Sequence, residues 1–168
     1  RPPKFLVLIA VIFGLVLTGC TVDDTGNDGE ANNREPISVS SAWVKAADSG
    51  MTAAFAGLHN DTASKITITS ITSPASDDVQ LHETVTAADH SSRMQEVKAG
   101  FALPAADNML LEPGGNHIML MNIKQPLLPG DEVTFTMHFA DGSKQDFTAV
   151  VKKFDGAKES YESHGKKH

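Results

Sequence analysis

The stretch from Glu132 to Lys152 reads EVTFTMHFADGSKQDFTAVVK and is the clearest guide to how this chain folds. Apolar and polar residues alternate along Glu132–Phe139, and Gln145–Lys152 is again rich in Phe, Thr and Val. A period of two with β-branched and aromatic residues is typical of a strand with one buried face. The turn residues Asp141 and Gly142 separate the two runs. We therefore predict two β-strands here, joined by a short turn.

The same pattern recurs toward the N-terminus. Seven further strand candidates are Ile37–Lys45, Thr52–His59, Lys65–Ile71, Val79–Val85, Met94–Lys98, Met109–Leu111 and His117–Ile123. Asn, Asp, Gly and Pro residues lie between several of them, as in Pro113-Gly114-Gly115. No segment keeps a helical period of 3.6 over three turns. Strands every 10–12 residues or so without intervening helices predict an all-β antiparallel sandwich or barrel over residues 36–153.

The N-terminal segment has the pattern of an export signal. Phe5–Leu17 is an apolar run, FLVLIAVIFGLVL, preceded by Arg1 and Lys4. It is shorter than the roughly 20 residues that a membrane-spanning helix needs. A basic flank followed by a short apolar run is typical of a secretory signal peptide. We expect residues 1–20 to be that signal.

The signal ends in Leu17-Thr18-Gly19-Cys20, which resembles the lipobox of bacterial lipoproteins. Cys20 is the only cysteine of the chain, and acylation explains its presence in an exported protein. Two or three acyl chains on Cys20 would hold the protein stably on the extracytoplasmic face of a bacterial cell membrane. The polar, acidic segment 21–35 is predicted to be a flexible tether, and the polar segment 154–168 a disordered tail.

Charge and motifs exclude several classes of function. Two of the 14 Lys and Arg residues precede Cys20, so the exported part carries 12 against 21 acidic residues, a formal charge near −9. This charge disfavours nucleic acid as a partner. The sequence contains no Gly-x-Ser-x-Gly, no phosphate-binding glycine loop and no His-Glu-x-x-His. We therefore expect a protein that is not an enzyme.

The unusual feature is methionine beside histidine in His117-Ile118-Met119-Leu120-Met121. On a strand, Ile118 and Leu120 share one face, and His117, Met119 and Met121 share the other. If the core takes Ile118 and Leu120, the His/Met face points outward or toward a rim. A lone methionine is usually core packing. Imidazole and thioether together are the donors that suit a soft ion such as Cu(I).

From about Ser41 to Val151, the chain resembles the extracytoplasmic copper chaperones of the PCu(A)C family. The matching stretches are Ala42-Trp43-Val44, Leu81-His82-Glu83-Thr84, Arg93-Met94, Leu103-Pro104-Ala105, Leu111 through Leu120, Pro126-Leu127 and Pro129-Gly130-Asp131. The family's metal motif is a His, a Met about a dozen residues later, and a His-x-Met some twenty residues after that. The resemblance therefore implies four metal ligands: His82, Met94, His117 and Met119. Some members carry Met directly after the first His, where this chain has Glu83, a hard donor that we do not count as a ligand.

The resemblance also implies the fold and function. It implies a cupredoxin-like sandwich with Greek-key-type connections that binds one Cu(I) and delivers it toward the copper centre of cytochrome c oxidase. Its partners would be the copper-bearing oxidase subunit and a Sco-type thiol protein. The exported domain has no cysteine beyond Cys20, so the His₂Cys site of a blue-copper redox protein is excluded.

Three further residues are candidate accessory ligands. Met121 shares the ligand face, although packing is the favoured role for it. His164 and His168 on the tail are candidates for Cu(II), which imidazole suits. Two other functions stay open at this stage: a copper buffer or resistance protein that delivers no metal, and a metal-free, adhesin-like surface sandwich.

Overall fold

The computed structural model describes residues 35–88, 91–156 and 160–161. Every regular element within these ranges is a β-strand, which confirms the all-β prediction. The strands are β1 (Ile37–Lys45), β2 (Thr52–Asn60), β3 (Ile66–Thr72), β4 (Asp78–Thr86), β5 (Ser92–Glu96), β6 (Phe101–Leu103), β7 (Asn108–Leu111), β8 (His117–Met121), β9 (Glu132–Phe139), β10 (Lys144–Lys152) and β11 (Ser160–Tyr161). Within the same ranges, no helix has the length and hydropathy needed to cross a membrane.

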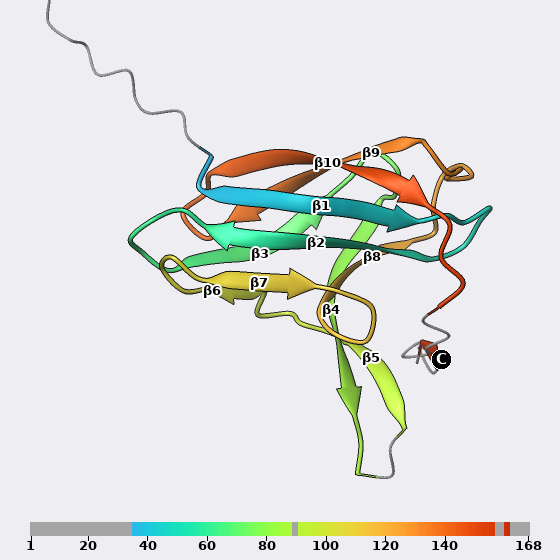
Figure 1. Ribbon diagram of the computed structural model, residues 1–168, viewed down its shortest axis with the longest axis horizontal. Helices are drawn as coiled ribbons and strands as arrows, with labels where there is room; N and C mark the ends of the chain where they lie inside the picture. The colour runs from blue at the N-terminus through green and yellow to red at the C-terminus, as the bar shows by residue number, and fades with distance from the viewer. Residues whose placement is uncertain (1–34, 89–90, 157–159, 162–168) are drawn as a thin grey trace, which may run out of the picture. The chain divides into compact units, whose positions relative to one another are not determined.

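The strands form one continuous, strongly folded sheet in the order β11-β5-β4-β8-β2-β1-β10-β9-β3-β6, and β7 pairs with the second half of β2. In Figure 1, β9 and β3 lie behind β10, β1 and β2, so the sheet closes into two layers. Most pairs are antiparallel, as predicted. The exceptions are β1 with β10 and β5 with β11, which are parallel.

The core lies between the two layers. On β9 the apolar residues are buried and the polar residues between them are more exposed, as the alternation predicted. Phe135 and Met137 of β9 are fully buried, and so are Ile68 of β3 and Ile118 and Leu120 of β8. The core therefore takes the face of β8 that carries Ile118 and Leu120, and His117 and Met119 occupy the opposite face.

The predicted strand positions are close to those observed, with two omissions. β6 has only three residues, Phe101–Leu103, and so gives no periodic signal. β11 falls in the segment that we expected to be a disordered tail, yet Ser160 and Tyr161 pair with Arg93 and Met94 of β5. Phe154, at the start of the same segment, packs edge-on against Trp43 with ring centroids 5.2 Å apart. Cys20, His90, His164 and His168 lie outside the described residues.

The β4–β5 hairpin extends away from the rest of the fold in Figure 1. Its base is joined to β8 through β4. This junction of β5, β4 and β8 carries all four residues of the predicted metal motif.

Candidate metal site

The strand register brings the four motif residues onto one face. His82 of β4 lies opposite His117 of β8, and Met119 lies opposite Gln80. On the other side of β4, Met94 of β5 lies opposite Thr84. Positions 80, 82 and 84 of one strand share a face, so Met94, His82, His117 and Met119 are neighbours across three strands.

A tight turn before β8 holds the His117 ring in place. The Glu112 N–H donates to the Asn116 carbonyl (2.8 Å), and the Gly115 N–H donates back to the Glu112 carbonyl (3.0 Å). Gly114 has φ of 84°, a left-handed conformation that favours glycine. The Gly115 carbonyl then lies 3.0 Å from His117 Nδ1 and also accepts the Thr84 N–H at 3.2 Å. The turn thus ties His117 to β4.

The contact with Gly115 fixes the tautomer of His117. A carbonyl only accepts, so Nδ1 carries a proton, and in the neutral ring Nε2 then presents its lone pair. His117 is 2% exposed, and its Nε2 is buried without a hydrogen-bond partner among the described residues. Buried polar atoms are almost always paired, so such an atom needs an explanation. A metal-binding histidine typically has this arrangement, in which one nitrogen bonds a carbonyl and the other is the ligand.

His82 lies beside His117 and is equally buried. The two ring centroids are 5.6 Å apart, and His82 is 1% exposed. With metal–nitrogen bonds of about 2.0–2.1 Å, two imidazoles on one ion have centroids roughly 4–6 Å apart. His82 Nε2 lies 2.8 Å from the Gln80 side-chain oxygen, so Nε2 carries the proton and Nδ1 is the candidate ligand atom.

The surroundings keep His82 neutral. Burial, and then the nearby His117, lower the pKa of His82 to about 4, although the Asp78 carboxylate acts in the opposite direction. A neutral imidazole is the form that binds a metal. His82 is therefore in the form that can bind a cation across the physiological pH range.

A cavity of about 240 Å³ opens beside these residues. Its lining residues are Lys45, Ala46, Ala47, Met51, Thr52, Ala53, Phe55, Met94, Pro113, His117 and Met119. The lining includes no carboxylate, and Lys45 is its only permanently charged side chain. Within the described ranges, no three His, Cys, Asp or Glu side chains cluster as metal ligands. Neutral sulfur and imidazole nitrogen suit a soft, singly charged cation far better than Ca²⁺, Mg²⁺ or Zn²⁺.

Comparison with known proteins places the chain in a family. Residues 37–151 match the model of a family described as "Putative lipoprotein LpqE-like". The chain belongs to this LpqE-like family. It is also 43% identical, over 153 residues, to "Putative lipoprotein Lxx21020" of Leifsonia xyli subsp. xyli, with 90% of each chain covered.

The fold matches solved PCuAC domains, which confirms the resemblance drawn from the sequence. The apo PCuAC domain from PmoF1 superposes with a TM-score of 0.59 at 17% identity, over 71% of this chain and 95% of that domain. The copper-bound PCuAC domain from PmoF2 gives 0.58 at 18% identity, over 71% and 94%. The solution structure of CuI-DR1885 from Deinococcus radiodurans gives 0.56 at 28% identity, over 73% and 83%.

Not all of the predicted site residues of this LpqE-like protein line the cavity. Met94, His117 and Met119 line the cavity, and His82 lies next to His117 without lining it. Met121 lies opposite Asp78, farther along β8, and is not among the lining residues.

The His/Met face of β8 was expected to point outward or toward a rim, and the outward alternative is wrong. His117 and Met119 are buried, at 2% and 5% exposure. β2 lies beside β8 in the sheet and pairs Ala53 with Met119, and the Phe55 side chain of β2 packs near His117, with ring centroids 6.3 Å apart.

Sequence reasoning missed two contributors to the cavity wall. Phe55 links His117 to Trp43, whose ring lies 4.5 Å from that of Phe55. Met51, which directly precedes β2, also lines the cavity and is 43% exposed. Because Met51 lies in a loop and outside the motif spacing, only the pairing of β2 with β8 identifies it.

Proposed function

We propose that this LpqE-like domain binds one Cu(I) through His82, Met94, His117 and Met119, as a carrier and not as an enzyme. The observation that carries the proposal is the buried lone pair of His117 Nε2 in a cavity lined by the thioethers of Met94 and Met119. The opposing His82 supplies a second imidazole. Two of the structures that resemble this chain are described as copper-bound or CuI forms, which supports copper as the metal.

The donor set suits transport. Thioethers are neutral and take up no protons, so Met94 and Met119 bind without competition from protons. Soft donors stabilise Cu(I) over Cu(II), and without a thiolate the site holds the ion less firmly than a cysteine site would. Zn²⁺ prefers nitrogen, oxygen or thiolate ligands and should compete poorly. The ion would thus stay in its reduced form and remain available to an acceptor.

We further propose that the domain is anchored by acylated Cys20 on the extracytoplasmic face of the membrane and delivers Cu(I) toward cytochrome c oxidase. The acceptor would be the copper-bearing oxidase subunit, assisted by a Sco-type thiol protein. The match to a family of predicted lipoproteins and the sequence Leu17-Thr18-Gly19-Cys20 support the anchor. Transfer of Cu(I) to the isolated copper-bearing domain of the oxidase distinguishes delivery from buffering.

The experiment that tests copper binding is competition for Cu(I) against a chromophoric chelator under reducing conditions. Met119→Leu keeps volume and apolarity and removes only the sulfur. Met109→Leu is the matched control, because Met109 is a partly buried methionine that packs against the core outside the cavity. We expect Met119→Leu to bind Cu(I) at least roughly tenfold more weakly, about 1.4 kcal/mol, and the control to bind like the parent. Equal binding by Met119→Leu and the parent would show that the thioether is no ligand.

A further inference from the structure

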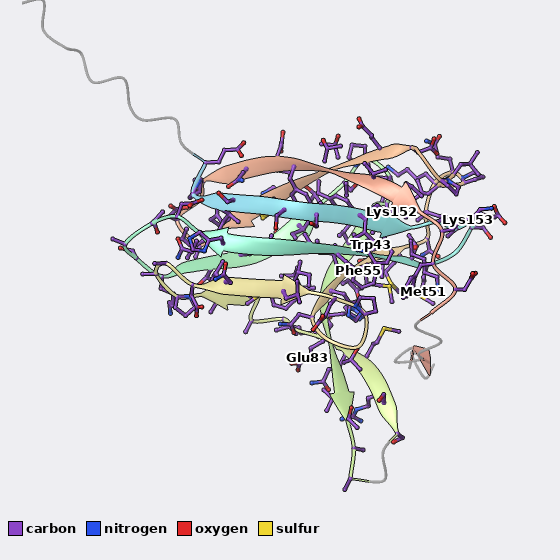
Figure 2. The ribbon with its side chains drawn as sticks, in the orientation of Figure 1. Trp43, Met51, Phe55, Glu83, Lys152 and Lys153 are labelled. Atoms are coloured by element: carbon purple, nitrogen blue, oxygen red, sulfur yellow. The ribbon has the colours of Figure 1, made fainter. Side chains whose placement is uncertain are left out.

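Three of the six methionines of the chain line the cavity of the candidate site, and their exposure increases from its floor to its mouth. Met119 is buried at 5% exposure, Met94 is partly buried, and Met51 is 43% exposed. Met51 lies outside the four-residue motif, near the base of the β4–β5 hairpin in Figure 2. Of the methionine sulfurs that line the cavity within the described residues, that of Met51 is therefore the most accessible to an incoming molecule.

The backbone around Met51 is held on both sides. The carbonyl of Gly50 accepts the Ile123 N–H at 2.9 Å, and Thr52 Oγ1 donates to the Lys45 carbonyl at 2.5 Å. Gly50 has φ of 77°, so a left-handed residue turns the chain immediately before Met51. The loop is also tied to Leu127 through two hydrogen bonds of Ala47, at 2.8 and 3.2 Å. The Met51 side chain, with three rotatable bonds, is therefore the flexible part of a fixed rim.

Packing alone does not account for a methionine here. A side chain that is 43% exposed gains only part of the free energy of burying a large apolar group. Leucine, which has similar volume and apolarity, would line this rim equally well. What methionine adds is a soft, neutral donor atom at the entrance of a site whose proposed ligands are buried or partly buried.

We propose that Met51 is a transfer ligand, which receives Cu(I) from the buried donors and presents it to the acceptor. This inference rests on the proposed Cu(I) site. In the transfer step a bond forms between Cu(I) and the Met51 sulfur before a bond to one of the buried donors breaks. No electron or proton moves, and copper stays Cu(I). Met51 would thus shorten the path between a buried site and a partner that cannot enter a cavity of about 240 Å³.

The test separates rate from affinity. Cu(I)-loaded parent, Met51→Leu and Met51→His proteins are mixed with excess bicinchoninate, and the coloured complex is followed by stopped flow. Equilibrium competition gives the Cu(I) affinity of the same proteins. Leu128→Met is the control for an added exposed sulfur, because Leu128 is 54% exposed and does not line the cavity.

We expect Met51→Leu to release Cu(I) about tenfold more slowly while its affinity stays within about threefold of the parent, under 1 kcal/mol. Met51→His restores a donor atom and should recover most of the rate, and Leu128→Met should leave it unchanged. Equal release by Met51→Leu and the parent would overturn the inference. A large loss of affinity in Met51→Leu would overturn it too, because Met51 would then be a resident ligand. If the parent itself binds no Cu(I), it is the proposed function that fails.

Discussion

The buried imidazole of His82 makes the stability of the metal-free protein depend on pH. Burial and the neighbouring His117 lower the pKa of His82 from 6.5 to about 4 in the folded protein. In the unfolded chain the imidazole returns to about 6.5. Above pH 6.5 His82 is neutral in both states, and its contribution to stability is fully present. As the pH falls below 6.5, His82 binds a proton in the unfolded chain but not in the folded protein. The free energy of unfolding therefore falls until about pH 4.

The size of this loss follows from the difference between the two pKa values. Each pKa unit corresponds to about 1.4 kcal/mol, so His82 alone should remove roughly 3 kcal/mol between pH 7 and pH 4. This is a large fraction of the 5–15 kcal/mol or so that stabilises a typical domain.

Urea unfolding of the metal-free protein at several pH values measures this loss, with fluorescence of Trp43, the single tryptophan, as the probe. His82→Leu removes the titrating group, and His59→Gln removes a histidine whose side chain is 39% exposed as a control. We expect the parent and His59→Gln to lose about 3 kcal/mol more than His82→Leu over this range. Parallel pH profiles for the parent and His82→Leu would refute the assignment of a neutral, buried His82.

The remaining predictions concern the fold, the anchor and the tail. Met119→Leu should lower the free energy of unfolding by less than about 1.5 kcal/mol, measured by the same urea titration, because it conserves volume; a larger loss would show that the sulfur is needed for packing. Cys20→Ala should abolish acylation, so that the protein stays an uncleaved precursor or leaves the membrane fraction; normal processing and unchanged partitioning would contradict the lipoprotein assignment. Deleting residues 162–168 removes His164 and His168 and should abolish weak Cu(II) binding, measured by electron paramagnetic resonance, while leaving Cu(I) affinity unchanged; an equal Cu(II) signal would exclude the tail as its site.

Much of the fold could be predicted from the sequence because the clearest strand, Glu132–Phe139, buries every second residue. Glu132–Phe139 and Ile37–Lys45 were located to the residue, and the turn residues Pro129-Gly130-Asp131 and Asp141-Gly142 flank the first of them. The parallel pairing of β1 with β10 was not predictable, because hydrophobic periodicity says nothing about which strands are neighbours. Phe101–Leu103 was missed because three residues are too few to show a period.

The donor residues of the candidate site could be predicted from the sequence, but their burial could not. The spacing of His82, Met94, His117 and Met119 matched a known motif, but a strand pattern cannot tell an exposed face from one that side chains distant in sequence bury. Phe55 of β2, which packs near His117, is one such side chain. The long-range pairing of β2 with β8 brings Met51 to the cavity, so no local pattern could have identified it.

X-ray absorption at the copper edge of the Cu(I)-loaded protein reports the atoms bound to the ion and so tests the proposed ligands themselves. We expect a Cu(I) edge, two sulfur and two nitrogen neighbours, and one sulfur fewer in Met119→Leu. Nitrogen or oxygen neighbours alone, with the same spectrum in the parent and in Met119→Leu, would contradict the proposed ligand set.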